Sequence, residues 1–311
     1  VVFACAGVGM VVGLIWFGVG RRQLLGNGSA PKGKEGFGPI LLVTLLGLAA
    51  VPLMYLLLSR NALLDYILWA LFIGCIAMLL RAGFSSDRVQ LDKIWALLIL
   101  FVANIMFWMF FEQAGSSFTF LAESLVDRRM FGSEFPIGWF QSINPAAIVL
   151  LGPVMTLIWL WTDRRKSEPS IPRKFALGLI GNAIGFAILM WALSSMITEV
   201  DGKSMIPFWP LAACYVVQTL GELCLSPIGL SMVTKLAPAH MVGATMGAWF
   251  MSISLGNKLA GNLAKWMSGE TGLSVASAYD GFSFSLYLLG GTGIVLLFVA
   301  PWINKLMHGV K

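Results

Sequence analysis

Charged residues are scarce in this chain, and their scarcity excludes most soluble classes of protein. Asp, Glu, Lys and Arg together make up 12% of the 311 residues, whereas 58% of the residues are hydrophobic. The mean hydropathy is +0.83. An ordinary soluble domain has about 25% charged residues, so this composition indicates a protein with several membrane spans.

Cysteine and histidine are also rare. The four cysteines are scattered through apolar segments, and their spacing indicates neither a disulfide framework nor a metal site: Cys5, Cys75, Cys214 and Cys224. The two histidines lie far from other candidate ligands, so we expect no His-based metal centre. The sequence has no P-loop and no Ser-His pair at a suitable depth, and we therefore expect no enzyme site.

Long apolar runs dominate the chain instead. A helix needs about 20 apolar residues to cross the hydrocarbon core of a bilayer. By that rule the sequence predicts an all-α polytopic membrane protein with nine spans. The predicted spans are 1–20, 38–58, 62–80, 94–120, 139–161, 175–197, 207–235, 242–267 and 282–306.

The lysines and arginines gather in alternate loops between these spans. Fifteen lie on one side, and five lie on the other: Arg60, Arg128, Arg129, Lys203 and Lys265. Cytoplasmic loops carry an excess of Lys and Arg, which predicts that the side with fifteen, including the C-terminus, is cytoplasmic. Basic residues placed in this way are topology signals, so the net charge of +6 does not indicate a nucleic-acid partner.

A linker, a helical hairpin and the start of the chain indicate how the protein is divided into parts. Segment 21–37 is rich in Gly, Lys and Pro and is predicted to be a flexible cytoplasmic linker. The short turn at 59–61 joins two apolar runs into a helical hairpin that faces lipid or packs sideways. The chain begins at Val1 inside an apolar run, without a charged leader, so we expect it to be a piece of a longer protein.

Two acids, Glu112 and Glu222, lie inside apolar runs. A carboxylate at bilayer depth costs about 2.5–3.5 kcal/mol, so it usually faces a wet cavity or a partner charge. Two such acids suggest a path for protons or for a cationic group of a substrate. The alternative is a buried ion pair that only fastens helices together, although Lys258 is the one basic residue at a comparable depth.

Helical spacing places further side chains beside these acids. Residues four apart share a face, which puts Trp108 and Ser116 beside the first acid, and Gln218 and Ser226 beside the second. The faces predicted in this way are polar stripes within otherwise apolar helices.

Three other residues have two interpretations each. The amide of Asn144 either binds a carboxylate or an amine, or caps the helix that starts at Pro145. Trp249 either lines a site or, as is commoner for tryptophan, packs in the interior or faces lipid. Lys258 either extends outward to the interface or pairs with an acid.

Four segments resemble, in the same order, motifs of the proton-dependent oligopeptide transporters, a branch of the major facilitator superfamily. Phe110–Ser117 is similar to the seventh-helix motif of that family, and Gln141–Pro145 is similar to its eighth-helix motif. Gly221–Pro238 resembles the tenth helix, and Met246–Phe250 resembles the eleventh. The resemblance covers nearly the whole chain.

The resemblance implies a major facilitator fold and the C-terminal part of a prokaryotic member. Residues 1–20 would be the last helix of the N-terminal bundle, followed by the linker 21–37. Residues 38–93 would be a lateral two-helix hairpin with its connecting loop, and residues 94–311 the C-terminal six-helix bundle. The rest of the N-terminal bundle, a partner needed to complete the central cavity, would be missing. The implied location is the inner (plasma) membrane of a bacterium.

The resemblance also implies roles for individual residues. Glu112 matches the acid that takes the coupling proton or pairs with an arginine at the outer gate, and Glu222 matches the acid that contacts the amino terminus of a peptide. The other implied substrate-binding positions are Asn144, Ser226, Trp249 and Trp108. The implied activity is proton-coupled symport of di- and tripeptides by alternating access, with the proton as coupling ion and no cofactor or metal.

Other functions stay open at this point. A related transporter of nitrate or another small solute is one alternative, although an acid such as Glu222 suits the ammonium group of a peptide. A membrane fragment without transport activity is a second alternative, and an intramembrane enzyme is a more distant one.

Overall fold

The computed structural model describes residues 2–24, 36–130, 132–268 and 272–310. The contacts divide the chain into two units, Val1–Leu64 and Asp65–Lys311. Most of the predicted linker 21–37 lies outside the described residues. The domain boundaries predicted at 37/38 and 93/94 stay predictions.

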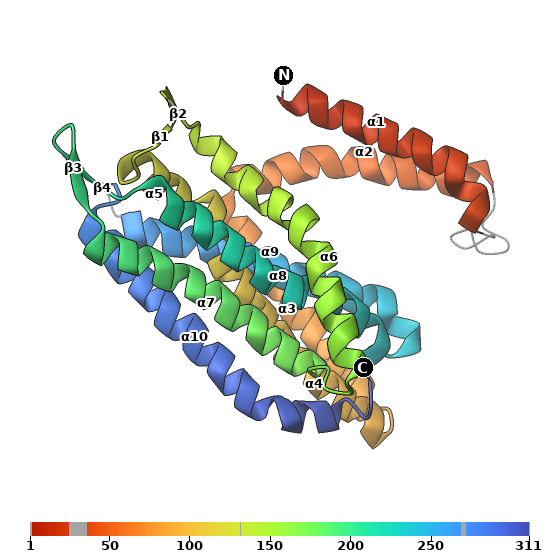
Figure 1. The fold of residues 1–311 in the computed structure, drawn as a ribbon. Helices are drawn as coiled ribbons and strands as arrows, with labels where there is room; N and C mark the ends of the chain where they lie inside the picture. Colours follow the sequence, from red (N-terminus) through yellow and green to blue (C-terminus); the bar gives the residue numbers. More distant parts are fainter. Residues whose placement is uncertain (1, 25–35, 131, 269–271, 311) are drawn as a thin grey trace. The chain divides into compact units, whose positions relative to one another are not determined.

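The described residues form mainly helices (Figure 1). The first unit contains α1 (Val2–Gly20), the short 3-10 helix η1 (Arg21–Leu24), α2 (Phe37–Ser59) and the start of α3 (Asn61–Phe84). The second unit contains the rest of α3 and these elements: α4 (Arg88–Phe111), η2 (Glu112–Gly115), α5 (Ser117–Ser124), β1 (Arg129–Met130), β2 (Ser133–Glu134), η3 (Ile137–Ser142), α6 (Ile143–Arg164), α7 (Ile171–Ser195), β3 (Thr198–Val200), β4 (Lys203–Met205), α8 (Phe208–Leu236), η4 (Ala239–Met241), α9 (Val242–Ser268) and α10 (Val275–Leu306).

Each of the nine predicted spans contains a long helix, which confirms the all-α class. By length and composition, 7 helical segments of the described chain are apolar enough to cross a membrane. α9 is outside that group. Polar residues in α9, including Asn257, Lys258 and Asn262, lower its hydropathy. Within the described residues, hydropathy supports a membrane span for seven of these helices.

Two short β-hairpins in the loops were not predicted. β1 pairs with β2, and β3 pairs with β4, both antiparallel. The second hairpin turns at Asp201 and Gly202, whose φ angles are 52° and 74°. Positive φ at both central residues is the type I′ geometry that an Asp-Gly pair favours, because this turn matches the twist of the flanking strands.

The second unit is built around α7, which lies beside both α8 and α10 (Figure 1). α7 and α8 approach each other backbone to backbone at small residues. A Cβ added to Gly221 would lie 2.7 Å from the carbonyl oxygen of Gly178, and one added to Gly178 would lie 2.9 Å from the carbonyl oxygen of Gly221. Small residues allow such close approach of membrane helices, and dispersion contacts then hold the helices together.

Aromatic rings fill the interior next to this crossing. Phe118 lies 5.7 Å from Phe186, 5.8 Å from Phe282 and 5.7 Å from Tyr215, measured between ring centroids. All four rings are buried. The contacts join α5, α7, α8 and α10, so Phe118 anchors the short helix α5 to three helices of the bundle.

An ion pair joins α3 to α9 within the second unit. Lys258 Nζ lies 2.8 Å from Asp65 Oδ1. Of the two interpretations of Lys258, the structure therefore supports the one in which this lysine pairs with an acid. The acid belongs to the helical hairpin, so the pair fastens one helix of that hairpin to α9.

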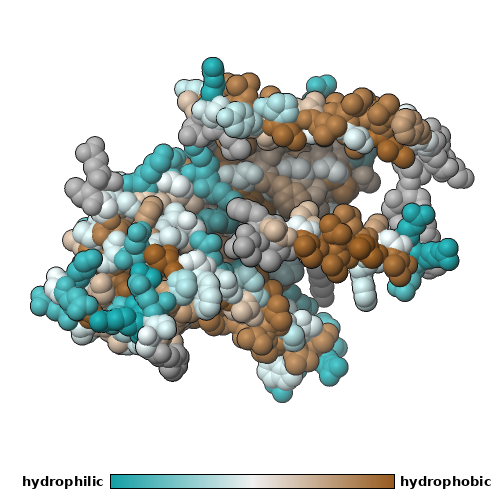
Figure 2. Space-filling view, turned by 90° about the horizontal axis from the view of Figure 1, so that it is seen from above, coloured by the Kyte–Doolittle hydropathy of each residue, from teal (hydrophilic) through white to brown (hydrophobic). Residues whose placement is uncertain are grey.

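The outer surfaces of the helices are apolar, as the hydropathy predicts. Figure 2 shows hydrophobic residues along the helices and hydrophilic residues gathered toward the side on which Figure 1 places the β-hairpins. On α10 the most exposed apolar side chains include Phe298 (79%), Tyr287 (72%) and Val295 (61%). A helix of this length with an exposed apolar face fits contact with lipid.

We predict that Gly221→Ala lowers the thermal stability of the purified protein in detergent. The new methyl group would lie too close to the backbone of α7, and overpacking of this kind costs about 1–3 kcal/mol. Gly290→Ala is the control, because its Cβ would meet only Ala183 Cβ at 3.6 Å, an ordinary contact. An equal effect of both substitutions on the melting temperature would show that the crossing is not tight.

Candidate functional site

Glu112 lies at a break in the fourth predicted span. The sequence predicts one continuous helix over 94–120, but α4 ends at Phe111, and η2 and α5 follow. The predicted stripe of Trp108, Glu112 and Ser116 on one helical face is therefore wrong beyond Glu112. The backbone of Ser116 is non-helical, with φ −132° and ψ −91°, so the chain changes direction there.

Hydrogen bonds with the two neighbouring helices α8 and α9 stabilise this break. The hydroxyl of Tyr215 on α8 donates a hydrogen bond to the carbonyl oxygen of Ala114 at 2.9 Å. Gln113 Nε2 donates to the carbonyl oxygen of Ala260 on α9 at 3.1 Å, and the hydroxyl of Ser117 donates to Gln113 Oε1. Irregular backbone at membrane depth needs such partners, because lipid offers none.

Glu222 on α8 is held by an amide from α6. Asn144 Nδ2 donates to Glu222 Oε2 at 2.8 Å and to Thr219 Oγ1 at 3.0 Å. The hydroxyl of Thr219 donates in turn to the carbonyl oxygen of Tyr215, one turn earlier on α8. Asn144 lies inside α6, whose N-cap is Ser142. The Asn144 amide therefore contacts a carboxylate of the protein itself rather than capping α6, and its contact with a substrate group stays a prediction.

A cavity of about 180 Å³ lies between these groups. Its lining residues come from the break after α4, from η3 and α6, and from α8: Phe111, Glu112, Ala114, Gly115, Gln141, Asn144, Tyr215 and Gln218. Two predicted site residues, Glu112 and Asn144, therefore meet in one cavity although they are far apart in the sequence. Glu222 adjoins it through its hydrogen bond with Asn144.

The two acids interact with each other as well as with the cavity. Glu112 lies close enough to Glu222 for their carboxyl charges to repel. Both side chains are half-buried. The described lining residues include no Lys or Arg, so negative charge at this site is not balanced by the part of the chain that the structure describes. The arrangement favours binding of a cation or a proton.

Gln218 has an unusual environment. It is buried, with 1% of its surface exposed, and its Nε2 has no hydrogen-bond partner among the described residues. A buried donor without a partner is costly, which makes it a candidate contact for a bound molecule. The helical spacing places Gln218 beside Glu222, and the structure puts it in the cavity wall.

The other predicted site residues lie away from this cavity. Trp249 is buried on α9 between Phe101 and Phe175, with ring centroids at 5.6 and 6.1 Å. A Cβ on Gly229 would lie 2.4 Å from the Trp249 ring, so this glycine makes the space for it. In this structure Trp249 packs in the interior, and its role at a substrate site stays a prediction.

Trp108 and Ser226 are also outside the cavity lining. Trp108 Nε1 donates to Asn104 Oδ1 at 3.1 Å, and Asn104 Nδ2 donates to Ser252 Oγ on α9 at 2.8 Å. This buried chain of hydrogen bonds joins α4 to α9. Ser226 is half-buried on α8, one turn after Glu222. Their predicted roles in substrate binding stay predictions.

Sequence reasoning did not single out Gln141 or Tyr215 as site residues. Gln141 precedes the helix that carries Asn144, and Tyr215 lies two turns before Glu222 on α8. Gln141 belongs to the same motif as Asn144, so the motif could have indicated it as a site residue. Tyr215 lies in an apolar run with no motif, so its contact with Ala114 could be found only from the fold.

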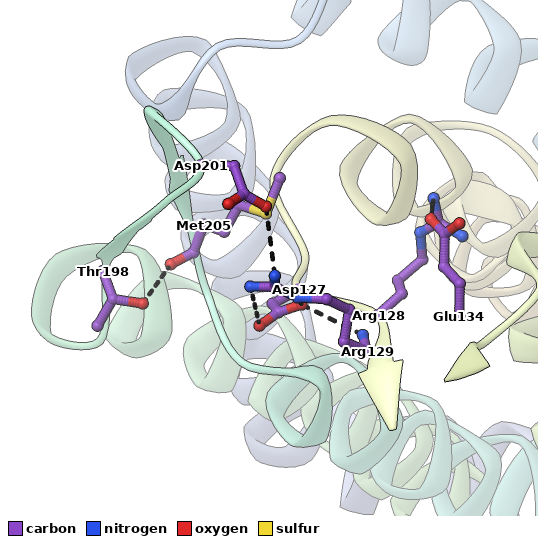
Figure 3. A network of polar contacts seen from close by, with 7 residues as sticks. All are labelled: Asp127, Arg128, Arg129, Glu134, Thr198, Asp201 and Met205. Atoms are coloured by element: carbon purple, nitrogen blue, oxygen red, sulfur yellow. Dashed lines mark hydrogen bonds and ion pairs between the residues drawn. The ribbon is translucent and has the colours of Figure 1, made fainter. Parts of the chain in front are cut away.

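A second polar cluster joins two loops at the end of the bundle that carries the hairpins (Figure 3). The guanidinium of Arg129 contacts Asp127 Oδ1 at 3.0 Å and reaches Asp201 Oδ2, on the β3–β4 hairpin, at 3.2 Å. Backbone hydrogen bonds between Leu125 or Asp127 and Ile206 support the same connection. The cluster therefore ties the loop after α5 to the loop before α8.

The fold and the site together define a polytopic α-helical membrane protein with acidic groups around a cavity between its helices, a design typical of secondary transporters. Residues 1–278 match the profile of the POT family, PTR2. The chain belongs to this family.

Named relatives agree with this assignment. The chain is 32% identical over 272 residues to the peptide transporter YePEPT of Yersinia enterocolitica, covering 88% of this chain and 52% of the relative. It is 31% identical to YclF, an uncharacterized transporter of Bacillus subtilis, and 28% identical to dipeptide and tripeptide permease B of Aeromonas hydrophila; each match covers 99% of this chain and 62% of the relative.

Solved structures of peptide transporters share the fold. A POT peptide transporter crystallised with alafosfalin superimposes with a TM-score of 0.72 at 27% identity, covering 99% of this chain and 62% of that one. The tetrameric PepTSo2 structure gives a TM-score of 0.69 at 27% identity and covers 98% and 63%. The chain thus spans between about half and two-thirds of the length of the proteins it matches.

We predict that Asp127 titrates below its ordinary range. Hydrogen bonds from Arg129 lower the pKa of the Asp127 carboxyl. The contact should be fully present above the ordinary pKa of aspartate, about 3.9, and should be lost as the pH falls through the lowered pKa. An NMR titration of carbon-labelled aspartate measures this pKa directly.

Arg129→Gln should return the pKa of Asp127 toward its ordinary value. Arg128→Gln is the matched control, because Arg128 pairs with Glu134 instead and should leave the Asp127 titration unchanged. A normal midpoint for Asp127 in the unmodified protein would contradict the prediction.

Proposed function

We propose that this chain contributes one half of a transporter that couples the uptake of di- and tripeptides to the movement of protons. The observation that carries the proposal is the meeting of Glu112, Asn144 and Glu222 around one cavity at membrane depth. An N-terminal bundle that completes the cavity is part of this proposal. The relatives named as peptide transporters and as dipeptide and tripeptide permeases support the choice of substrate.

The charge of the site favours a peptide over an anion such as nitrate. Two half-buried acids without a described basic neighbour would repel an anion and attract an ammonium group. Glu222 supplies the negative charge. The amide nitrogen of Asn144 donates to Glu222 and Thr219, so its amide oxygen is left to accept a hydrogen bond from the ammonium group. The amino terminus of a short peptide fits a carboxylate beside an amide oxygen.

The mechanism assigns different tasks to the two acids. Glu112, at the break after α4, binds the coupling proton, and Glu222 binds the amino terminus of the peptide. Protonation of Glu112 removes the repulsion between the two carboxyl groups, so the proton and the position of the helices become linked. Rocking of the bundles around a fixed central site would then move the peptide and the proton together. No cofactor or metal is part of this scheme.

The proposed location is the plasma membrane of a bacterium, with several spans and a cytoplasmic C-terminus. The distribution of Lys and Arg supports this orientation. The named relatives come from bacteria.

We predict that Glu112→Gln abolishes acid-driven accumulation of a labelled dipeptide in liposomes, while exchange of labelled for unlabelled peptide continues. Glutamine keeps the size and hydrogen bonding of glutamate but cannot take up the proton. The assay uses the complete transporter with and without an imposed proton gradient. Glu123→Gln is a control, because this exposed acid lies at the end of α5, outside the cavity lining. Accumulation that survives in the Glu112 variant would show that the coupling proton binds elsewhere.

We predict that Glu222→Gln weakens binding of dipeptides with a free amino terminus more than binding of N-acetylated dipeptides. Loss of a charge-assisted contact costs about 1.5–3 kcal/mol, which corresponds to roughly a tenfold to hundredfold change in affinity for the free peptides. Competition against a labelled peptide measures both affinities. Equal weakening of the two peptide classes would remove the proposed role of Glu222.

A further inference from the structure

A larger cavity, of about 730 Å³, lies at the far end of the second unit from the β-hairpins, where α6 and α10 end and α7 begins. Its lining residues are Asp163, Lys166, Glu168, Pro169, Ser170, Ile171, Arg173, Lys174, Pro301, Asn304, Lys305, Gly309 and Val310. Four of these side chains are basic and two are acidic. The proposed transport function uses none of them.

One of the four basic residues is already paired. Lys174 Nζ contacts Glu168 Oε1, and its charge lies 4.7 Å from the centre of the Trp159 ring. This lysine is buried, so the pair fixes the loop before α7 against α6. The acid Glu168 is thereby neutralised and does not compete with an anion in the cavity.

The other three basic residues are Lys166, Arg173 and Lys305. Within the described residues their side chains have no ion pair and no hydrogen bond. Asp163 is the one acid in the lining without a basic partner there. Three unpaired cations from α7, α10 and the loop between α6 and α7 therefore face a common space that holds net positive charge.

One wall of this cavity continues into the apolar surface of α10. Val295, Phe298 and Trp302 are spaced by three and four residues, so they share one helical face, and their exposed fractions are 61%, 79% and 54%. Lys305 follows three residues later and continues the same face. A molecule with apolar chains along α10 would place its polar head at Lys305.

Aromatic residues mark this level as a membrane interface. Trp302 on α10 and Trp161 on α6 are each more than half exposed, and the guanidinium of Arg165 lies 4.0 Å from the centre of the Trp161 ring. Exposed tryptophans beside basic residues are typical of the headgroup region of a bilayer. By the excess of Lys and Arg, this end of the bundle is the cytoplasmic one.

We propose that this cavity binds the phosphate headgroup of an anionic membrane lipid, such as phosphatidylglycerol, with its acyl chains on the exposed face of α10. Basic pockets between membrane helices on the cytoplasmic side suit such headgroups. The continuous apolar face of α10 favours a lipid over free phosphate, because a soluble anion would gain nothing from Val295, Phe298 and Trp302. The proposal does not depend on the transported substrate.

Native mass spectrometry of the purified protein tests the proposal, with phosphatidylglycerol, phosphatidylcholine and inorganic phosphate as separate probes. We expect retention of phosphatidylglycerol over phosphatidylcholine. The variant Lys166→Gln/Lys305→Gln should bind phosphatidylglycerol about thirtyfold more weakly, from roughly fivefold for each basic residue removed. Both lysines are exposed, so the variant should fold normally.

Lys203→Gln/Lys265→Gln is the matched control. It removes the same two charges from exposed lysines elsewhere on the second unit and should leave lipid retention unchanged. Equal loss in both variants, or no preference for the anionic lipid, would overturn the proposal. Displacement of the lipid by inorganic phosphate alone would identify a free-anion site and would also overturn it.

Discussion

The close crossing of α7 and α8 is the constraint on which the candidate site depends. At Gly178 and Gly221 the two backbones meet with no room for a methyl group, which fixes both the distance between the helices and the rotation of α8. Glu222 follows Gly221 directly, so the face of α8 that meets α7 also determines that the carboxyl group turns toward Asn144 on α6. A second glycine, Gly229, leaves space for Trp249 from α9. α8 thus contacts α7 and α9 through glycines and contacts α6 through the carboxyl group of Glu222.

The break after α4 shows how the same bundle accommodates polar groups. A helix that stops inside a membrane leaves backbone groups without partners, and lipid cannot supply them. Here Tyr215 donates a hydrogen bond to the carbonyl oxygen of Ala114, and the side chain of Gln113 donates one to the carbonyl oxygen of Met109 near the end of α4. The result is that Glu112 is placed beside a cavity rather than on the side of a regular helix. The irregular backbone and the acid are therefore two parts of one feature, and both depend on α8 and α9 being in place.

Acidic and basic side chains of the second unit lie in different places, because a charge without a partner is costly in lipid. The acids Glu112 and Glu222 lie inside, next to amides and hydroxyls, and the lysine at intermediate depth, Lys258, is paired with Asp65. Basic residues with no ion pair among the described residues gather at the end of the bundle with exposed tryptophans. At the opposite end, arginines are neutralised by acids in the hairpin cluster. Each location gives its charges either a partner or access to water and headgroups.

The sequence by itself determined the helical membrane class, the positions of nearly all helices and the two acids, because long apolar runs and the price of a buried charge are local properties of the chain. Its motifs also indicated the family to which the chain belongs. Only the tertiary structure decided that Asn144 contacts Glu222 rather than capping its own helix, that α4 ends at Phe111, and that Lys258 pairs with Asp65. It also placed Trp249 against Gly229. These outcomes depend on which helices are neighbours and how each is rotated, and spacing along one helix contains no information about either.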